Sequence, residues 1–445
     1  MHISFFLEKF KQNKFKEAMI WKGQSYTYEW LLARFDYWRD YLKQNKLKDG
    51  RVVSLEADFS PNTVALLLNL IEKKSIIVPL TKSVEMKKTE FRQIAEVETI
   101  IKVDASDNCI IENTNVDVEH EVLTRLKQKN HPGLILFSSG STGKSKAAVH
   151  DLVPFLEKFK VKRHALRSIT FLLFDHIGGI NTLLYTLSNG GTVITVNNRS
   201  PENVCKLIEK HKVELLPTSP TFLNLILLSE AYKKYDLSSL NLITYGTEVM
   251  SASTLVRIHE LFPNVRLLQT YGLSEVGILR SKSKSSDSLW VKVGGEGFKT
   301  RVVDGLLEIK SQSAMLGYLN APSPFTDDGW FKTGDAVEID GEYIKILGRR
   351  SEIINVGGEK VYPAQVESVI QLMEEVEDVT VTGEANPITG QIVKAKIKLK
   401  TNYDTTEFRK NMRSFWKDKL PTFMIPQKVE FVNETMYGKR FKKMR

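Results

Sequence analysis

The chain has 445 residues, of which 42% are hydrophobic and 26% are charged, so it is a globular protein with apolar material for roughly two to four domains or subdomains. The formal net charge is +10, but the basic residues are dispersed among acidic ones except at the C-terminal tail, and no zinc-finger or RNP-type motif accompanies them, which argues against a nucleic-acid partner. No apolar run approaches the roughly 18 residues of a membrane span and no signal peptide is evident, so we expect a cytoplasmic protein.

The region before residue 289 predicts strands that alternate with helices. Leu31, Phe35, Trp38 and Leu42 recur at helical spacing and predict one apolar helix face. Such alternation predicts parallel sheets covered by helices, and therefore an α/β fold. The expected strands are 52–55, 75–80, 134–137, 169–174, 191–196, 213–216, 242–245 and 265–269, and the expected helices are 62–72, 180–187, 201–212 and 253–261.

The pattern changes near residue 289. From there to residue 347 the segments are short, β-rich and punctuated by glycine, which predicts an antiparallel sheet or small barrel. A small α+β unit follows, with helices from about residue 363 and over 405–420, and strands over 379–382, 392–399 and 428–432. We therefore expect an N-terminal domain over 1–347, a hinge over 348–351 and a C-terminal domain over 352–445.

A glycine-rich loop follows the expected strand 134–137. Residues 138–146 read SSGSTGKSK, and their glycines and hydroxyls leave backbone N–H groups free to wrap an anion, while Lys144 and Lys146 add positive charge. Gly143, Lys144 and Ser145 look like the end of a Walker A loop, but that motif requires a glycine at position 138, which is Ser. The spacing therefore argues against a P-loop phosphotransferase and leaves a phosphate cradle or, for the loop alone, a surface turn.

Four further motifs follow the loop in a fixed order. They are residues 271–275 (YGLSE), 330–335 (WFKTGD), 348–363 (GRRSEIINVGGEKVYP) and 437–440 (YGKR). Together with the loop they resemble the signatures of the adenylate-forming superfamily, the AMP-dependent synthetase and ligase family that includes acyl-CoA synthetases, nonribosomal peptide adenylation domains and firefly luciferase. Ser145 replaces the proline usual in that loop, and we expect this change to loosen it.

The resemblance implies a fold and an activity. The fold is a large N-terminal domain of two αβ-layered subdomains plus a small β-barrel, followed by a small mobile C-terminal α+β domain. The activity is that of an ATP-dependent acid–thiol ligase, which forms acyl-AMP, releases pyrophosphate and passes the acyl group to the pantetheine thiol of coenzyme A or a carrier protein. The alternatives are an amino acid-adenylating enzyme that loads a separate carrier protein, a luciferase-like oxygenase, and a non-catalytic nucleotide-binding relative.

The resemblance also implies residues that hold ATP and Mg²⁺. Thr142 and Glu275 are the implied magnesium-associated pair, and Lys439 is the implied catalytic lysine, placed between the carboxylate and the α-phosphate. Tyr271 would stack on adenine, unless it is a core aromatic residue, and Asp335 would accept hydrogen bonds from both ribose hydroxyls. The implied phosphate-binding residues are Ser138, Ser139, Gly140, Ser141, Thr142, Gly143 and Lys146, and the implied adenine- and ribose-binding residues are Gly246, Thr247, Glu248, Tyr271, Ser274, Asp335 and Arg349.

The acid and the thiol have fewer implied contacts. His176 would border the acyl pocket, together with Gly179 and Tyr245, whereas Asp175 would pair with the amino group of an amino acid substrate. Because neighbouring residues of a strand face opposite ways, we expect only one of Asp175 and His176 to face the pocket, and we favour His176. In the second half-reaction Ser351 would act as the hinge, and Gly358 and Lys360 would border the thiol tunnel. The sequence does not identify the acid, the thiol acceptor or the oligomeric state.

Overall fold

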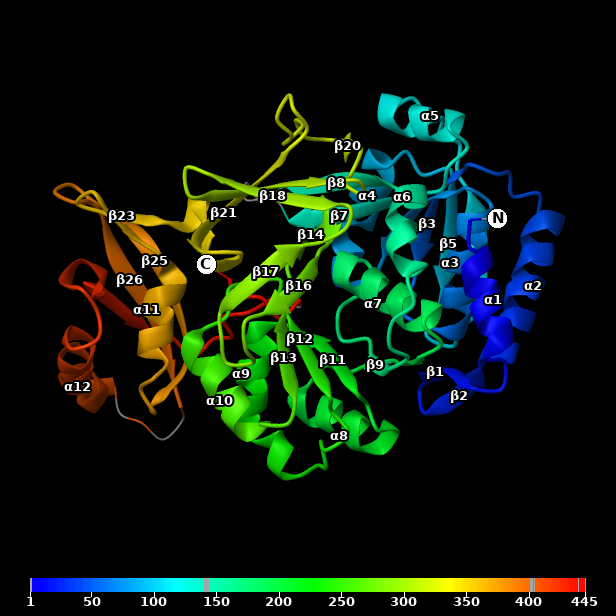
Figure 1. Cartoon of the computed structure of the whole chain (residues 1–445). Helices are drawn as coiled ribbons and strands as arrows, with labels where there is room; N and C mark the ends of the chain where they lie inside the picture. The colour runs from blue at the N-terminus through cyan, green and yellow to red at the C-terminus, as the bar shows by residue number, and fades with distance from the viewer. Residues whose placement is uncertain (1, 140–143, 401–402, 404, 439, 445) are drawn as a thin grey trace.

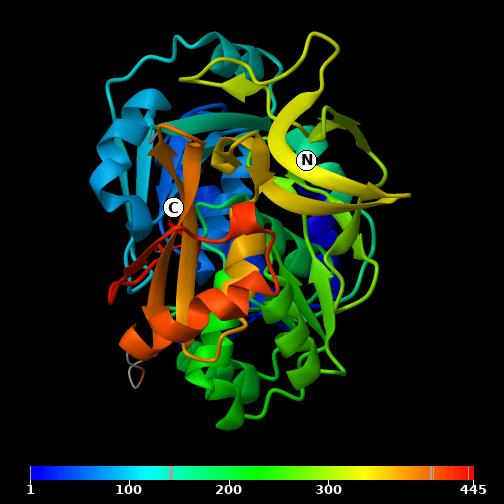
Figure 2. The same cartoon turned by 90° about the vertical axis from the view of Figure 1, so that its left-hand side faces the viewer.

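The computed structural model describes residues 2–139, 144–400, 403, 405–438 and 440–444. In this part of the chain the backbone forms two large mixed sheets, an antiparallel sheet and a smaller C-terminal sheet (Figure 1). We refer to the part before residue 348 as the large domain and to the part after residue 351 as the small domain. The small domain lies at one end of the molecule, and the end of the chain turns back between the two domains (Figure 2).

The first sheet of the large domain has seven strands in the order β13-β12-β11-β9-β10-β1-β2. Neighbouring strands run parallel, except for the hairpin of β1 and β2 at one edge. β1 pairs with β10, with Met19 opposite Val193, although the two strands lie far apart in the sequence. The strands are β1 (Glu17–Trp21), β2 (Gln24–Thr27), β9 (Arg167–Ile169), β10 (Thr192–Ile194), β11 (Leu215–Thr218), β12 (Leu242–Tyr245) and β13 (Arg266–Gln269).

The second sheet also has seven strands, in the order β20-β8-β7-β4-β3-β5-β6. Its centre is parallel, while β8 and β20 on one side and β6 on the other run antiparallel to their neighbours. The strands are β3 (Val52–Glu56), β4 (Ile76–Leu80), β5 (Thr99–Val103), β6 (Cys109–Asn113), β7 (Gly133–Ser139), β8 (Ser145–Asp151) and β20 (Gly317–Tyr318).

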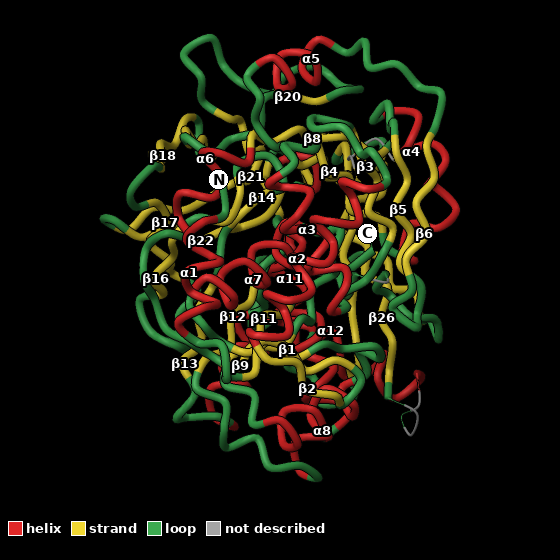
Figure 3. Tube along the Cα trace, turned by 90° about the vertical axis from the view of Figure 1, so that its right-hand side faces the viewer, coloured by secondary structure: helices red, strands yellow, loops and turns green. Residues whose placement is uncertain are grey.

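A helical layer separates these two sheets (Figure 3). At its centre is α3, which begins because Ser60 caps it by accepting the Thr63 N–H and because Pro61 fits the first helical position. Its residues 61–71 are buried from all sides, as expected for a helix between two sheets. The helices of this layer are α1 (Ser4–Gln12), α2 (Tyr28–Gln44), α3 (Pro61–Glu72), α6 (Leu152–Leu156) and α7 (Ile177–Ser188).

Further helices cover the outer faces of both sheets. The first sheet is covered by α8 (Pro201–His211), α9 (Pro220–Ser229) and α10 (Ala252–Leu261), and the second by α4 (Lys88–Ile94) and α5 (Glu121–Gln128). None of the helices in the described part of the chain is long and apolar enough to cross a bilayer.

The antiparallel sheet follows the strand order β16-β17-β22-β21-β19-β18, and a two-stranded ribbon of β14 and β15 precedes it. The small domain pairs β24-β23-β26-β25, with β27 parallel to β26, and packs α11 and α12 on one core. The strands and helices of these parts are β14 (Gly272–Leu273), β15 (Gly277–Ile278), β16 (Arg280–Ser283), β17 (Trp290–Gly294), β18 (Phe298–Val303), β19 (Leu306–Ser311), β21 (Phe331–Asp340), β22 (Tyr343–Arg349), β23 (Ile354–Val356), β24 (Glu359–Val361), α11 (Pro363–Ile370), β25 (Val376–Asn386), β26 (Gly390–Leu399), α12 (Thr405–Lys417) and β27 (Lys428–Phe431).

Two expectations about the elements need correction. The strand expected over 169–174 ends at Ile169, because the apolar side chains that follow it are buried in two different cores rather than along one sheet. Phe171 packs in the core beneath the first sheet and Phe174 packs in the layer between the two sheets. The antiparallel sheet expected from residue 289 already begins with β16 at Arg280.

Candidate active site

A cavity of about 190 Å³ lies at the carboxyl ends of β11, β12 and β13. Loops after these strands form one wall, the beginning of α7 forms another, and residues near the C-terminus complete it. This edge is where open α/β sheets bind ligands. Of the site residues expected from the sequence, those that line the cavity are Ser138, His176, Gly246, Thr247, Ser274, Glu275 and Arg349.

The glycine-rich loop connects two strands of a β-hairpin. β7 and β8 pair Ser138 with Lys146 and Ser139 with Ser145, so a strand follows the loop, whereas a P-loop requires a helix there. The expected phosphate ligands Gly140, Ser141, Thr142 and Gly143 lie outside the described residues. Ser138, near the described end of β7, lines the cavity.

Asn320 holds the arm of the hairpin in which Ser145 replaces the usual proline. Its amide Nδ2 donates to the Ser145 carbonyl at 2.8 Å, and its Oδ1 accepts the Ala147 N–H at 3.0 Å. The Lys146 ammonium lies 5.3 Å from the centre of the Tyr318 ring. Side-chain hydrogen bonds thus fix the arm that follows the loop, and the loosening of the loop expected from Ser145 stays a prediction.

Glu275 is the only carboxylate among the described residues that line the cavity. It lies in the turn between β14 and β15, and its Oε1 accepts the Tyr318 hydroxyl at 2.7 Å. The carbonyl of the preceding Ser274 bonds to Nε2 of the buried His150, which holds the turn from the opposite side. No other described residue donates a hydrogen bond to this carboxylate, which lines the cavity.

Tyr271, Asp335 and Arg349 form a hydrogen-bonded group beside the cavity. The Tyr271 hydroxyl donates to Asp335 Oδ2, and Arg349 Nε contacts Asp335 Oδ1 at 2.9 Å. Burial raises the pKa of the Asp335 carboxyl, against the opposing effects of Arg349 and the Tyr271 hydrogen bond. Tyr271 is itself buried in the core of the antiparallel sheet and does not line the cavity, so its place here fits the core alternative rather than a stacking surface.

His176 and Asp175 face different surroundings, as expected. His176 caps α7 through Nδ1, which accepts the Gly178 N–H at 3.0 Å, so the ring proton is on Nε2. Burial, and then the nearby Lys442, lowers the pKa of His176 well below its usual value, which keeps the ring neutral at physiological pH. His176 lines the cavity, whereas Asp175 does not.

Asp175 is engaged in a separate buried cluster. Its Oδ2 accepts the Thr81 hydroxyl at 2.8 Å and the Ser83 hydroxyl at 3.2 Å, and its Oδ1 lies 3.8 Å from Arg440 Nη2. Hydrogen bonds thus engage Oδ2, whereas Oδ1 is buried without a hydrogen bond from the described residues and has the more distant Arg440 as its ion-pair partner.

Tyr245 and Gly179, both expected beside the substrate, are not among the described residues that line this cavity. In β12 the side chain of Thr244 lines the cavity, so Tyr245, the next residue, points into the opposite core. A Cβ on Gly179 would lie 1.9 Å from the Leu173 carbonyl oxygen, so glycine permits α7 to pack closely against the preceding loop.

Glu248, expected near adenine, lies outside the cavity as well. Its Oε1 accepts the Thr221 N–H at the start of α9 at 2.7 Å, and its Oε2 accepts the Lys443 N–H at 3.0 Å. Gly246 and Thr247 do line the cavity, and a Cβ on Gly246 would lie 2.5 Å from the Thr270 carbonyl oxygen. Glu248 therefore links the large domain to the end of the chain.

Two cations that line the cavity were not predicted from the sequence. Arg440 and Lys442 belong to the basic C-terminal tail, a pattern typical of a solvated surface. The signal for them in the sequence is that Arg440 ends the YGKR motif and Lys442 follows it by two residues. Burial lowers the pKa of Lys442 to about 8, and Arg440 acts in the same direction. The predicted catalytic Lys439 lies outside the described residues.

The residues expected to serve the thiol lie away from the cavity. Ser351 is in a short 3₁₀ turn after β22, and Gly358 and Lys360 are exposed at and after the turn between β23 and β24. Gly358 has φ +95° and faces open space, so its backbone conformation rather than a close contact requires glycine in this arrangement. Their roles in hinge movement and thiol access stay predictions.

The charges that line the cavity are mostly positive. The described lining residues include the cations Arg349, Arg440 and Lys442 and a single carboxylate, Glu275. The described residues contain no cluster of three or more His, Cys, Asp or Glu side chains able to hold a metal by themselves. The cavity is therefore suited to a multiply charged anion that brings its own ligands for a metal.

Comparisons with known proteins agree with this geometry. The sequence model of the family described as "AMP-binding enzyme" matches residues 6–318, and that of the "AMP-binding enzyme C-terminal domain" matches residues 365–439. The chain is 25% identical to a long-chain-fatty-acid–CoA ligase of Bacillus subtilis (strain 168), over 81% of this chain and 67% of that protein. It is 29% identical to an indoleacetate–CoA ligase of Aromatoleum aromaticum, over 60% of this chain and 57% of that protein.

Solved structures share the fold. The crystal structure of an anthranilate CoA ligase in complex with anthranoyl-AMP superposes with a TM-score of 0.80 at 19% sequence identity, covering 99% of this chain and 95% of that one. This likeness extends through both domains, including the small C-terminal one.

Proposed function

The chain belongs to the AMP-binding enzyme family, and from this premise we propose that it is an ATP-dependent acid–thiol ligase. It would join a carboxylic acid to the α-phosphate of ATP, release pyrophosphate, and then pass the acyl group to a pantetheine thiol. The observation that carries this proposal is the set of residues that line the cavity. Ser138 of the glycine-rich hairpin, the carboxylate Glu275 and three cations all border it.

The chemistry of the first step explains why such a cavity is needed. A carboxylate oxygen attacks the α-phosphorus, an acyl–O–P bond forms, and the bond from the α-phosphorus to pyrophosphate breaks without any proton transfer. Two anions must approach each other, so the protein has to supply positive charge and fixed donors where they meet. The cations Arg349, Arg440 and Lys442 provide such charge, and the neutral His176 borders the same space.

The site also fits Mg²⁺ in the way that nucleotide-binding sites commonly do. Mg²⁺ is usually held by one or two carboxylates together with substrate phosphates, and Glu275 is the carboxylate among the described residues that line the cavity. When bound, Mg²⁺ neutralises charge on the phosphates. Glu275 would hold the ion, with Thr142 as the second residue that the resemblance implies.

The substrate is a carboxylic acid without a required amino group. In the amino acid alternative Asp175 would pair with the substrate ammonium, but its oxygens face Thr81, Ser83 and Arg440, and it does not line the cavity. The names of the curated relatives point to coenzyme A as the acceptor, whereas a carrier protein is the alternative acceptor.

Exchange of radioactive pyrophosphate into ATP measures the first step and tests the proposal. We expect wild-type protein to catalyse exchange with at least one acid from a panel of short, fatty, aryl and amino acids. Lys439→Ala should lower this exchange by about 100-fold or more, because a cation at the reacting oxygens is lost, while the exposed small-domain variant Lys417→Ala should match wild type. No exchange with any acid, or full exchange by Lys439→Ala, would contradict the proposal or the assignment of Lys439, respectively.

A further inference from the structure

The described chain ends in a short hairpin, residues 436–444, which we call the terminal hairpin. Tyr437 pairs with Lys443 in an antiparallel bridge, the Gly438 N–H donates to the Lys442 carbonyl at 3.0 Å, and the Met444 N–H donates to the Met436 carbonyl at 2.9 Å. Lys442 therefore lies on the returning arm of a hydrogen-bonded structure rather than on a free tail.

The large domain fixes the backbone on both sides of Lys442. The carbonyl of Phe441 accepts the Ser219 hydroxyl at 2.7 Å, and the N–H of Lys443 donates to Glu248 at 3.0 Å. Ser219 directly precedes α9, and Glu248 lies in the loop after β12. Both are close to the cavity wall. The contacts of Phe441 and Lys443 thus fix the position of the Lys442 backbone between them.

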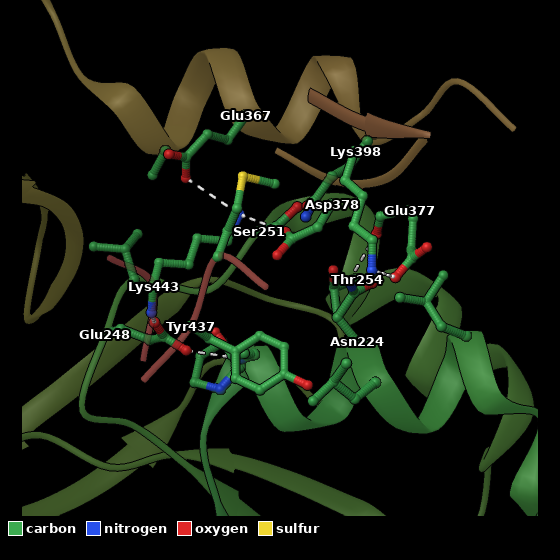
Figure 4. Close-up of a pocket in the computed structure, with 18 of the residues that line it drawn as sticks. Asn224, Glu248, Ser251, Thr254, Glu367, Glu377, Asp378, Lys398, Tyr437 and Lys443 are labelled. Carbon is green, nitrogen blue, oxygen red and sulfur yellow. Dashed lines mark hydrogen bonds and ion pairs between the residues drawn. The ribbon is translucent and has the colours of Figure 1, made fainter. Parts of the chain in front are cut away.

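Side chains strengthen this attachment. The Phe441 ring packs against Phe171 and Phe222 of the large domain, with ring centres 5.2 and 5.5 Å apart. On the other side, Lys443 Nζ donates to the Val379 carbonyl of the small domain at 2.7 Å. Figure 4 shows Lys443 and Tyr437 in the crevice between Glu248 of the large domain and Glu367 of the small domain.

Lys442 differs from the other cations of the cavity because no ion pair joins it to another described residue. Arg349 pairs with Asp335 at 2.9 Å and Arg440 faces Asp175 at 3.8 Å. Among the described residues the Lys442 ammonium makes no hydrogen bond or ion pair, although it borders the cavity. Burying a cation without a counter-charge is costly, so an anionic ligand would stabilise Lys442 at this position.

The location of Lys442 relates it to both reactants. Lys442 and His176 line the 190 Å³ cavity and also a smaller cavity of about 10 Å³ bordered by Leu172 and Phe441. His176 is on the side where the resemblance places the acid, and Glu275 and Arg349 are on the side of the nucleotide. Lys442 is close enough to both sides for electrostatic interaction with His176 on the one and with Arg349 and Glu275 on the other.

We propose that Lys442 is a second substrate-contacting cation, which binds the carboxylate and the α-phosphate as they meet, in addition to the role proposed for Lys439. This inference rests on the proposed ligase function. Lys442 follows Lys439 by three residues in the sequence, and of the two only Lys442 belongs to the described part of the chain. In the step itself Lys442 keeps its proton and only offsets negative charge while the acyl–O–P bond forms and pyrophosphate leaves.

The experiment separates the two half-reactions. The variants are Lys442→Met, which keeps the aliphatic stem, Lys442→Arg, which keeps the charge, and Lys417→Ala as an exposed control in the small domain. Each is assayed for pyrophosphate exchange with the acid that wild type uses best, and for thioester formation from synthetic acyl-AMP and coenzyme A. Circular dichroism and melting temperature report on folding.

For Lys442→Met we expect a loss of at least about 30-fold in kcat/KM of exchange, in line with the removal of one charge-stabilising donor. Lys442→Arg should recover most of this loss, and Lys417→Ala should equal wild type. Thioester formation from acyl-AMP should change less than about threefold in all variants, because that step no longer joins the two anions.

Several outcomes would overturn the inference. Exchange by Lys442→Met at the wild-type rate would show that the ammonium is not used. Equal losses in both half-reactions, or a Lys442→Arg variant as impaired as Lys442→Met, would indicate a structural role for the side chain. Absence of exchange by wild type with every acid would instead overturn the proposed function, and the inference with it.

Discussion

A buried lysine behind the cavity allows a prediction whose magnitude follows from the structure. Lys158 Nζ donates to Asn181 Oδ1 at 2.6 Å and lies about 5 Å from the Phe155 and Phe159 ring centres, at 5.1 and 5.0 Å. Asn181 in turn lines the cavity. Burial lowers the pKa of Lys158 from 10.5 to about 7. A positive charge on Lys158 therefore destabilises the folded protein.

The free-energy cost can be worked out from this pKa. A difference of one pH unit corresponds to about 1.4 kcal/mol, so the lowering from 10.5 to about 7 costs about 5 kcal/mol below pH 7, where both folded and unfolded chains carry the proton. Between pH 7 and 10.5 the unfolded chain binds more protons than the folded one, so this cost decreases as pH rises. From pH 7 to pH 9 the decrease is about 2 kcal/mol.

Lys158→Met removes the charge and retains a side chain of similar length. After subtracting roughly 1–2 kcal/mol for the lost hydrogen bond and ring contacts, we expect the variant to be more stable than wild type by about 2–3 kcal/mol at pH 7. At pH 9 the advantage should shrink by about 2 kcal/mol. Urea unfolding of both proteins at the two pH values measures this, and all other titrating groups cancel in the difference.

Two outcomes of the urea experiment would contradict this account of Lys158. If the stability difference between Lys158→Met and wild type were the same at pH 7 and pH 9, the lysine would titrate alike in folded and unfolded chains. If the variant were less stable at pH 7, the contacts of the ammonium would outweigh the cost of burying it.

Two further predictions concern groups beside the cavity. Tyr271→Phe removes a hydroxyl donor from the buried Asp335 carboxylate, so we expect a loss of about 1–3 kcal/mol in the free energy of unfolding by urea; an unchanged value would show that Asp335 finds another donor. Gly179→Ala would place a Cβ 1.9 Å from the Leu173 carbonyl oxygen and force α7 away from the preceding loop, so we expect the free energy of unfolding to fall by about 2–4 kcal/mol; a wild-type melting curve would contradict this packing.

Elements with strong local signals could be predicted from the sequence almost to the residue. The helix expected over 62–72 is α3, because the cap at Ser60 and Pro61 defines its start, and the apolar face of Leu31, Phe35 and Trp38 is the buried face of α2. The apolar run after Ile169 was read as strand because hydrophobicity reports burial but not the partner that buries it.

The candidate site was only partly accessible to sequence reasoning. Alternation along a strand predicts that one of two neighbours faces a cavity, but not which: Thr244 lines the cavity, whereas Tyr245 packs in the core on the other side of the sheet. The position of Lys442 depends on contacts that its two neighbours make with residues far earlier in the chain. Ser219 lies 222 residues before Phe441, and Glu248 lies 195 residues before Lys443. No local pattern in a basic tail carries that information.

The pairing of β1 with β10 has a consequence for how the protein is made. Strand β1 contains Ala18, Met19 and Ile20, which are buried in the finished sheet. At roughly 5–20 residues per second, a ribosome needs on the order of ten seconds or more to proceed from Trp21 to Thr192, where β10 begins. Throughout that interval the nascent chain exposes an apolar strand whose parallel neighbour does not yet exist, so during synthesis this edge is where a chaperone has the most to shield.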